Sequence, residues 1–131
     1  MVRLLCTPIF LLLSIMAIGQ QKTSETLTEP TSVLRHVVSF KFKEDAPSAK
    51  IDEIVAAFEA LPSKIAEIKG FEWGINNSPE GHDKGFKHVF LLTFHSEADR
   101  AVYLPHPDHQ AFGALLGPYL EDVMVVDYWS K

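Results

Sequence analysis

Apolar residues alternate with other residues along several short stretches of the chain, a pattern that predicts β-strands with one buried face. The longest is residues 86–95, FKHVFLLTFH, where one face collects Phe, His, Phe, Leu and Phe. Residues 35–42, RHVVSFKF, repeat the pattern with His36, Val38 and Phe40 on one face. Two weaker stretches have the same character. The predicted strands are residues 35–42, 70–77, 86–95 and 122–129.

Between the first two strands, apolar residues recur at the spacing of an amphipathic helix. They run from Ile51 to Leu61, and Ser48 stands where a helix N-cap is expected. Pro62 should end or kink this helix, because a proline in a helix removes a backbone hydrogen bond and clashes with the preceding turn.

Two further helical segments are predicted between the third and fourth strands. Ser96, with Asp99 three residues later, approximates a capping box at the start of the first segment. This segment stops near Pro105. Pro107 suits the first turn of the second segment, which runs to about Leu116 and is followed by a Gly-Pro pair.

The order of these elements, β-α-β-β-α-β with the second helical region in two pieces, predicts a ferredoxin-like α+β fold. In that fold a single four-stranded antiparallel sheet carries its helices on one face. The first and third strands also carry apolar residues on their second face, among them Val37, Val89 and Leu91. An open face is normally polar, so something must cover this one. No sequence remains to do so, and we therefore expect a homodimer packed sheet against sheet.

Residues 1–19 differ from the rest of the chain, because one basic residue is followed by a mostly apolar run, residues 4–19. The run is shorter than the roughly 20 residues that cross a bilayer and ends in small residues, which predicts a signal peptide and a secreted or periplasmic protein. An uncleaved anchor is the alternative; Cys6 precedes the apolar centre, which excludes a lipoprotein. The polar residues 20–33 are interpreted as a flexible linker, and residues 34–131 as the domain.

Charge and cysteine content narrow the class of function. The chain carries 12 basic and 17 acidic residues, and loss of Arg3 with the signal peptide leaves 11 basic residues, a formal charge of −6. This balance argues against nucleic acid as a partner and against stable association with an anionic membrane. Cys6 is the only cysteine and leaves with the signal peptide, so a disulfide, a thiolate nucleophile and a cysteine-ligated metal are excluded.

The stretch YLPHPDHQAF, residues 103–112, places a tyrosine, two histidines and an aspartate close together. His109 has a side chain that accepts protons near neutral pH, and Tyr103 can donate a hydrogen bond to a substrate oxygen. The alternative is structural, with His109 bracing the turn at the two prolines. His106 and Asp108 beside it do not make a convincing metal site, because Asp108 points off the face that the histidines share. We assign no metal and no cofactor.

Several of these motifs together resemble the stress-responsive dimeric α/β-barrel (Dabb) family. RHVVSFKF, GFEWG, KHVFLLTF, Y-x-x-H-P-x-H and DYW stand in the same order and spacing as in that family, over about residues 34–129. The resemblance implies small ferredoxin-like proteins that form homodimers, in which two sheets close a barrel.

The resemblance also implies site residues. A plant polyketide cyclase of this family, which makes olivetolic acid, uses a tyrosine and a histidine that match Tyr103 and His109, and a further pocket histidine matches His36. Phe58 and Leu120 stand where that cyclase has a tyrosine and a tryptophan, so this pocket lacks two of its polar groups. Many family members carry the same stretch with no established activity.

The first expectation is therefore a binding module that holds a small apolar or aromatic molecule between sheet and helices. The alternatives are a cyclase-like enzyme using Tyr103 and His109, and a monooxygenase by analogy of fold. A cavity filled by side chains would leave only a structural dimer. His36 and His88 either line the pocket or are satisfied core histidines. The predicted ligand-binding residues are His36, Val38, Phe40, Val55, Phe58, His88, Phe90 and Leu120.

Overall fold

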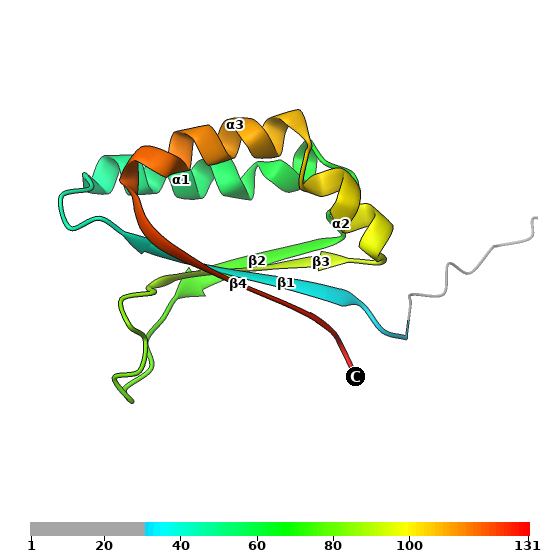
Figure 1. The fold of residues 1–131 in the computed structure, drawn as a ribbon, viewed down its shortest axis with the longest axis horizontal. Coiled ribbons are helices and arrows are strands. Elements are labelled where there is room, and N and C mark those ends of the chain that lie inside the picture. Colours follow the sequence, from blue (N-terminus) through cyan, green and yellow to red (C-terminus); the bar gives the residue numbers. More distant parts are fainter. Residues whose placement is uncertain (1–30) are drawn as a thin grey trace, which may run out of the picture.

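The computed structural model describes residues 31–131, in which a four-stranded antiparallel sheet carries three α-helices on one face (Figure 1). The predicted signal peptide, residues 1–19, and all but the last three residues of the predicted linker, 20–33, lie outside the described residues. The elements confirm the predicted ferredoxin-like arrangement. They are β1 (Leu34–Phe42), α1 (Ser48–Glu59), β2 (Gly70–Ile75), β3 (His88–Phe94), α2 (Glu97–Tyr103), α3 (Pro107–Leu116) and β4 (Leu120–Trp129), with short 3-10 turns at Leu61–Ser63 and Gly117–Tyr119.

The strand order β2-β3-β1-β4 places β1 at the centre and β4 at an edge of the sheet. His36 of β1 pairs with Leu92 of β3 on one side and with Asp127 of β4 on the other. Residues that pair directly across a sheet share a face. The register therefore brings Asp127, from the far end of the chain, beside a histidine of the first strand.

Phenylalanine rings fill the centre of the layer between sheet and helices. The Phe58 ring of α1 lies 4.5 Å, centroid to centroid, from both Phe90 of β3 and Phe112 of α3. Phe40 of β1 lies 5.0 Å from Phe90. Tilted and offset rings at this spacing add to the free energy gained by burying them. These contacts connect four elements, α1, α3, β1 and β3, and fix the distance between the helices and the sheet.

The predicted starts of α2 and α3 are confirmed, and that of α1 needs a correction. The Ser96 hydroxyl accepts a hydrogen bond from the Asp99 backbone N–H at 3.0 Å, and Pro107 opens α3. Ser48 is not the N-cap of α1: that position is Pro47, and no side chain caps the helix. Pro47 displaces the serine by one residue, because its fixed φ of −62° with an extended ψ suits the residue before a helix.

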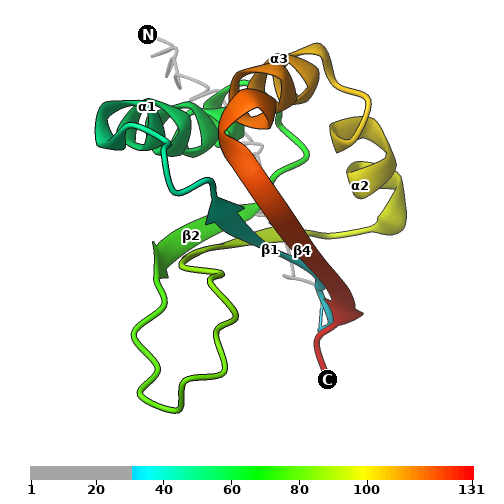
Figure 2. The same cartoon turned by 60° about the vertical axis from the view of Figure 1, so that its left-hand side comes forward.

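The other face of the sheet carries no helix, and only the loop between β2 and β3 projects on that side (Figures 1 and 2). The edge strand β4 is the most exposed element; Val123, Met124, Val125 and Val126 are each more than two-fifths exposed. Within residues 31–131 no helix is long and apolar enough to cross a membrane.

Candidate functional site

A cavity of about 330 Å³ lies beside the phenylalanine cluster, between the helix-facing side of β1 and β4 and the helices α2 and α3. Most of its wall is aliphatic or aromatic. Seven of the predicted site residues line it: His36, Val38, Phe40, Phe58, Tyr103, His109 and Leu120. The central rings thus leave a space unfilled, and this space collects the polar residues that the sequence singled out.

A second, larger hollow of about 590 Å³ lies on the helix-free side against β2 and Val89 and Leu91 of β3. Glu72 is the only ionisable residue in its wall. It is a shallow surface on the face that we expect a second subunit to cover, so the smaller cavity is the better candidate for chemistry.

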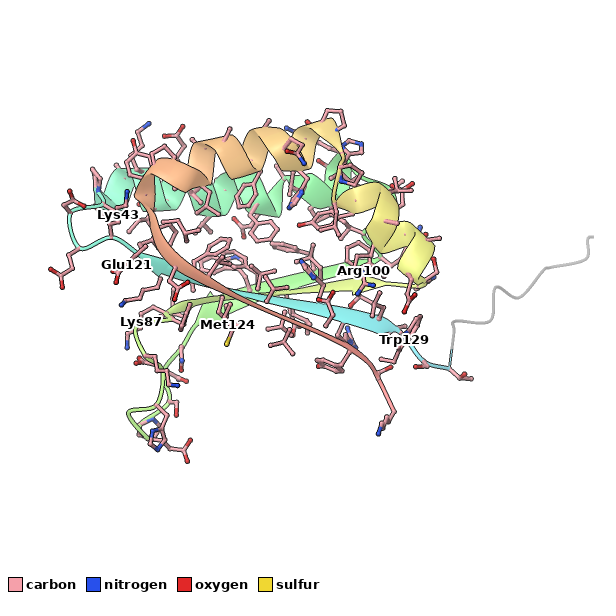
Figure 3. All side chains as sticks on the ribbon, viewed as in Figure 1. Lys43, Lys87, Arg100, Glu121, Met124 and Trp129 are labelled. Carbon is pink, nitrogen blue, oxygen red and sulfur yellow. The ribbon has the colours of Figure 1, made fainter. Side chains whose placement is uncertain are left out.

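An ion pair closes one end of the cavity. His36 Nδ1 lies 2.6 Å from Asp127 Oδ1, and Arg100 of α2 donates to the other carboxylate oxygen, also at 2.6 Å. Figure 3 shows Arg100 between α2 and the sheet. The His36 side chain is only 7% exposed, while the Asp127 side chain is 28% exposed because β4 is an edge strand. The carboxylate therefore connects a buried histidine to a helix that carries another site residue, Tyr103.

Tyr103 and His109 stand together in the same wall. Their ring centroids are 4.3 Å apart, and the Tyr103 ring lies edge-on to His36 at 5.8 Å. Tyr103 ends α2 and His109 lies in the first turn of α3, so the short connection between the helices sets their spacing. His36 from β1 and the rings of Tyr103 and His109 from residues 103–112 therefore form one cluster.

The Tyr103 hydroxyl has no hydrogen-bond partner among residues 31–131, although the residue is only 1% exposed. Burial raises the pKa of Tyr103 well above its ordinary value, because the phenolate would be poorly solvated. The hydroxyl therefore stays protonated at neutral pH. It is available to donate a hydrogen bond to a molecule in the cavity, and it cannot act as a general base.

The hydrogen bond of His109 defines which of its nitrogens carries the hydrogen. His109 Nδ1 lies 2.9 Å from the backbone carbonyl oxygen of Leu104, which can only accept. Nδ1 therefore donates, and Nε2 of the neutral ring is left with a free lone pair. A base next to a protonated phenol is the arrangement that proton transfer at a carbonyl compound requires.

Three predicted ligand-binding residues do not line the cavity: Val55, Phe90 and His88. Val55 and Phe90 are buried in the core behind it. His88 pairs with Phe40, four residues from His36 along β1, a distance of about 13 Å at the rise of a strand. It shares the helix-facing side with His36 but lies toward the opposite end of the sheet.

His88 has aromatic neighbours of its own. Its ring lies edge-on to Phe42 at 5.0 Å and parallel to Trp73 at 6.5 Å. Its Nδ1 is the only fully buried side-chain nitrogen or oxygen without a hydrogen-bond partner in the described part of the chain. Burial lowers the pKa of His88, and the negative charge of Asp52 offsets part of this shift.

Asp127 and Arg100 were not predicted from the sequence, and neither were apolar wall residues such as Leu104 and Val125. The signal for Asp127 was present, since it is a lone carboxylate at the end of an apolar strand, DVMVVDYW. Its pairing with His36 could not be predicted, because only the register of β4 against β1 places Asp127 beside that histidine. No group of three or more His, Cys, Asp or Glu side chains within residues 31–131 is arranged to hold a metal ion.

The family model for the stress responsive A/B barrel domain (Dabb) matches residues 34–130. The chain belongs to the Dabb family. Its relatives include an Arabidopsis thaliana stress-response A/B barrel domain-containing protein, At5g22580, 37% identical over 101 residues that cover 75% of this chain and 86% of the relative. Olivetolic acid cyclase of Cannabis sativa is 26% identical over 75% of this chain and 97% of the cyclase.

Solved structures agree with this assignment. Hydroxynitrile lyase from Passiflora edulis has a TM-score of 0.72 and 30% identity, over 78% of this Dabb chain and 96% of the lyase. A dimeric protein with a ferredoxin-like fold from Bacteroides fragilis has a TM-score of 0.60 and 31% identity, over 73% of this chain and 94% of that one. The proteins similar to this chain thus include enzymes of two kinds and a dimeric protein.

Proposed function

We propose that this Dabb protein binds a small, mostly apolar molecule in the cavity between β1, β4, α2 and α3. The cavity volume, about 330 Å³, lies at the lower end of the range found for ligand sites in proteins. Its wall is apolar apart from one cluster of polar rings and the Asp127 carboxylate, which is the usual composition of a site that orients a small ligand.

The observation that carries this proposal is the Tyr103 hydroxyl. Tyr103 lines the cavity, and its unpaired hydroxyl is not among the fully buried atoms of the described residues, so it opens onto the cavity. A bound molecule that accepts its hydrogen bond gains about 0.5–1.5 kcal/mol.

The experiment fills the cavity and leaves the fold intact. A Cβ added at Gly113, which lines the cavity, meets no atom within 4 Å, so the backbone there accepts a side chain and we expect the ring of Gly113→Phe to enter the cavity. The matched control is Ala114→Phe, an exposed position on the same helix. Binding of 4-ethylphenol is measured by calorimetric titration. We expect the Gly113 variant to lose at least about tenfold in affinity, or 1.4 kcal/mol, and the control to keep it. Equal binding by both variants would place the ligand elsewhere.

A second function is favoured by the pairing of Tyr103 with His109. The Nε2 of His109 serves as general base and the Tyr103 hydroxyl stabilises developing charge on a substrate oxygen, as proposed for a cyclase-like enzyme. The similarity to olivetolic acid cyclase and to a hydroxynitrile lyase supports an acid–base reaction of a carbonyl compound. The test is a pair of variants. His109→Ala should abolish turnover and keep binding, and Tyr103→Phe should abolish turnover and weaken binding severalfold. The monooxygenase alternative rests on fold alone.

We also propose that two copies of the chain pack their helix-free sheet faces together into a closed barrel. That face carries the exposed side chains of Met124, Val126 and Tyr128, and Figure 3 shows Met124 pointing away from the helices. Sedimentation of residues 20–131 should give a dimer at micromolar concentration. Val126→Glu should dissociate it, whereas Val102→Glu, at an exposed position on α2, should not.

Export is proposed on the sequence of residues 1–19 alone. Mass spectrometry of the protein recovered from outside the producing cytoplasm should find an N-terminus near Gln20. Recovery of the uncleaved chain in the membrane fraction would favour the anchor.

A further inference from the structure

Arg100, Asp127 and His36 form a chain of charged and polar groups from α2 through β4 to β1. Both carboxylate oxygens of Asp127 are used, one by His36 Nδ1 and the other by Arg100. His36 and Asp127 line the cavity, and Arg100 stands behind them, outside the wall.

We propose that Arg100 and Asp127 are positioning residues that fix His36 with its hydrogen on Nδ1, so that Nε2 offers the cavity a hydrogen-bond acceptor. The occupant is then a molecule with an apolar body and a hydroxyl or other X–H donor. This inference rests on the proposed ligand site and names the chemistry that the site selects.

The hydrogen bond between His36 and Asp127 determines which ring nitrogen of His36 carries the hydrogen. A carboxylate accepts and does not donate, so the hydrogen between Asp127 and His36 belongs to Nδ1. In the neutral ring, Nε2 then has a lone pair and no hydrogen. A carboxylate hydrogen-bonded to the far side of the ring fixes the tautomer of metal-bound and catalytic histidines in other proteins in the same way.

The other ring nitrogen of His36, Nε2, is open to the cavity. His36 Nε2 has no partner within residues 31–131, yet it is absent from the buried unpaired atoms of that region, of which His88 Nδ1 is the only one. Nε2 therefore reaches open space, and the space that His36 lines is the cavity.

His109 strengthens the selection for a donor. Its Nδ1 hydrogen is given to Leu104, so its Nε2 is also an acceptor in the neutral ring. The polar end of the cavity then holds two imidazole acceptors and one hydroxyl, that of Tyr103. The tyrosine has a single hydrogen to donate, so one imidazole acceptor stays unsatisfied unless the ligand brings a donor.

Arg100 is needed because Asp127 lies on an exposed edge strand. Without a partner for its second oxygen, the carboxylate is free to rotate toward water. The hydrogen bond from Arg100 is charge-assisted, and such bonds are roughly twice as strong as neutral ones. It holds the carboxylate in the rotamer that meets His36 and ties α2, which carries Tyr103, to β4.

The tautomer is read directly by nitrogen-15 NMR of the imidazole rings at mildly alkaline pH, without any ligand. The wild type should show His36 with its hydrogen on Nδ1. Asp127→Asn should move it to Nε2, because the amide can donate to Nδ1, and loss of the aspartate in a Ser-His-Asp triad misplaces the tautomer in the same way. Arg100→Met should give a mixture, and Arg100→Lys should restore the wild-type signal. Lys50→Met, which removes an exposed charge on α1 paired with Glu53, should change nothing.

Binding of two probes tests the selection. 4-Ethylphenol can donate a hydrogen bond, and 4-ethylanisole can only accept one. The wild type should prefer the phenol by about fivefold, the worth of one neutral hydrogen bond. In Asp127→Asn, where Nε2 becomes a donor, the preference should disappear or reverse.

The outcomes separate the two proposals. A wild-type His36 with its hydrogen on Nε2, or a tautomer unchanged in both Asp127→Asn and Arg100→Met, overturns the positioning role. Equal binding of the two probes by the wild type overturns the selection for a donor and leaves the ligand site standing. Failure of both probes to bind counts against the ligand site, while the NMR result still decides the tautomer. If Asp127→Asn does not fold, the Arg100 pair of variants carries the test.

Discussion

The Tyr103 ring lies 4.3 Å from the imidazole of His109, and its hydroxyl faces no protein group with which it could form a hydrogen bond within the described part of the chain. Because this hydroxyl is not among the fully buried unpaired atoms of the described residues, it opens onto the cavity that Tyr103 lines. The ring is needed for packing, since Phe94 also contacts it at 5.2 Å, but the hydroxyl is not.

Tyr103→Phe should therefore separate stability from binding. The free energy of unfolding should stay within about 1 kcal/mol of the wild-type value, because the hydroxyl forms no hydrogen bond within the described residues and the variant keeps the ring. Affinity for 4-ethylphenol should fall severalfold. Chemical denaturation and calorimetric titration measure the two effects. Tyr119→Phe, outside the cavity wall, is the control, and a marked loss of stability in Tyr103→Phe alone would reveal a structural hydrogen bond.

Phe58→Ala should be among the most destabilising single changes in the domain. Phe58 contacts four other phenylalanine rings, at centroid distances from 4.5 to 5.9 Å, and is 1% exposed. Removal of such a side chain leaves a cavity and typically costs about 3–5 kcal/mol. Urea denaturation checks this value. Phe86→Ala, in the loop before β3, should cost far less, and a similar loss at both positions would contradict the assignment of Phe58 to the core.

The fold followed from sequence because its signals are local. Alternation in RHVVSFKF and FKHVFLLTFH fixed both the strands and the face that each strand buries, and the helix-facing residues His36, Val38 and Phe40 are all buried. The ends of the elements depend on features that are less local. The second strand was expected to reach residue 77 and ends at Ile75, because a loop with left-handed backbone at Gly81, Lys84 and Gly85 begins soon after it.

The site followed only in part, because it depends on register. Tyr103 and His109 are close in sequence, and their proximity could be expected from the turn between them. The position of Asp127 beside His36 comes from pairing two strands 91 residues apart, which no local pattern encodes. His88 lies outside the cavity for the same reason: it shares a face with His36, but its position along that face is set by the register of β3 against β1.

The stability of the domain should depend on pH through His88. Because burial lowers its pKa in the folded state, the unfolded chain binds a proton at a higher pH than the folded chain does. The contribution of His88 is therefore fully present above its ordinary pKa of 6.5 and is lost as the pH falls through that value toward the lower folded-state pKa. His88→Gln should flatten the fall in unfolding free energy between pH 8 and pH 5. Denaturation curves across this range measure it, and His82→Gln, on an exposed loop, should keep the wild-type slope.

Ser96 and Ser48 stand at the starts of two helices, yet only Ser96 forms a cap. Its hydroxyl accepts the Asp99 N–H, and the Asp99 carboxylate in turn accepts the backbone N–H of His95 at 3.1 Å. Ser96→Ala should therefore cost about 1 kcal/mol, the usual worth of an N-cap. Ser48→Ala should be neutral or slightly stabilising, because Ser48 is already inside α1 and alanine is the better helix former. Thermal and urea denaturation of the two variants compare the same chemical change at the two positions. An equal loss at both would show that Ser48 forms a cap, and no loss at Ser96 would show that the cap there adds nothing to stability.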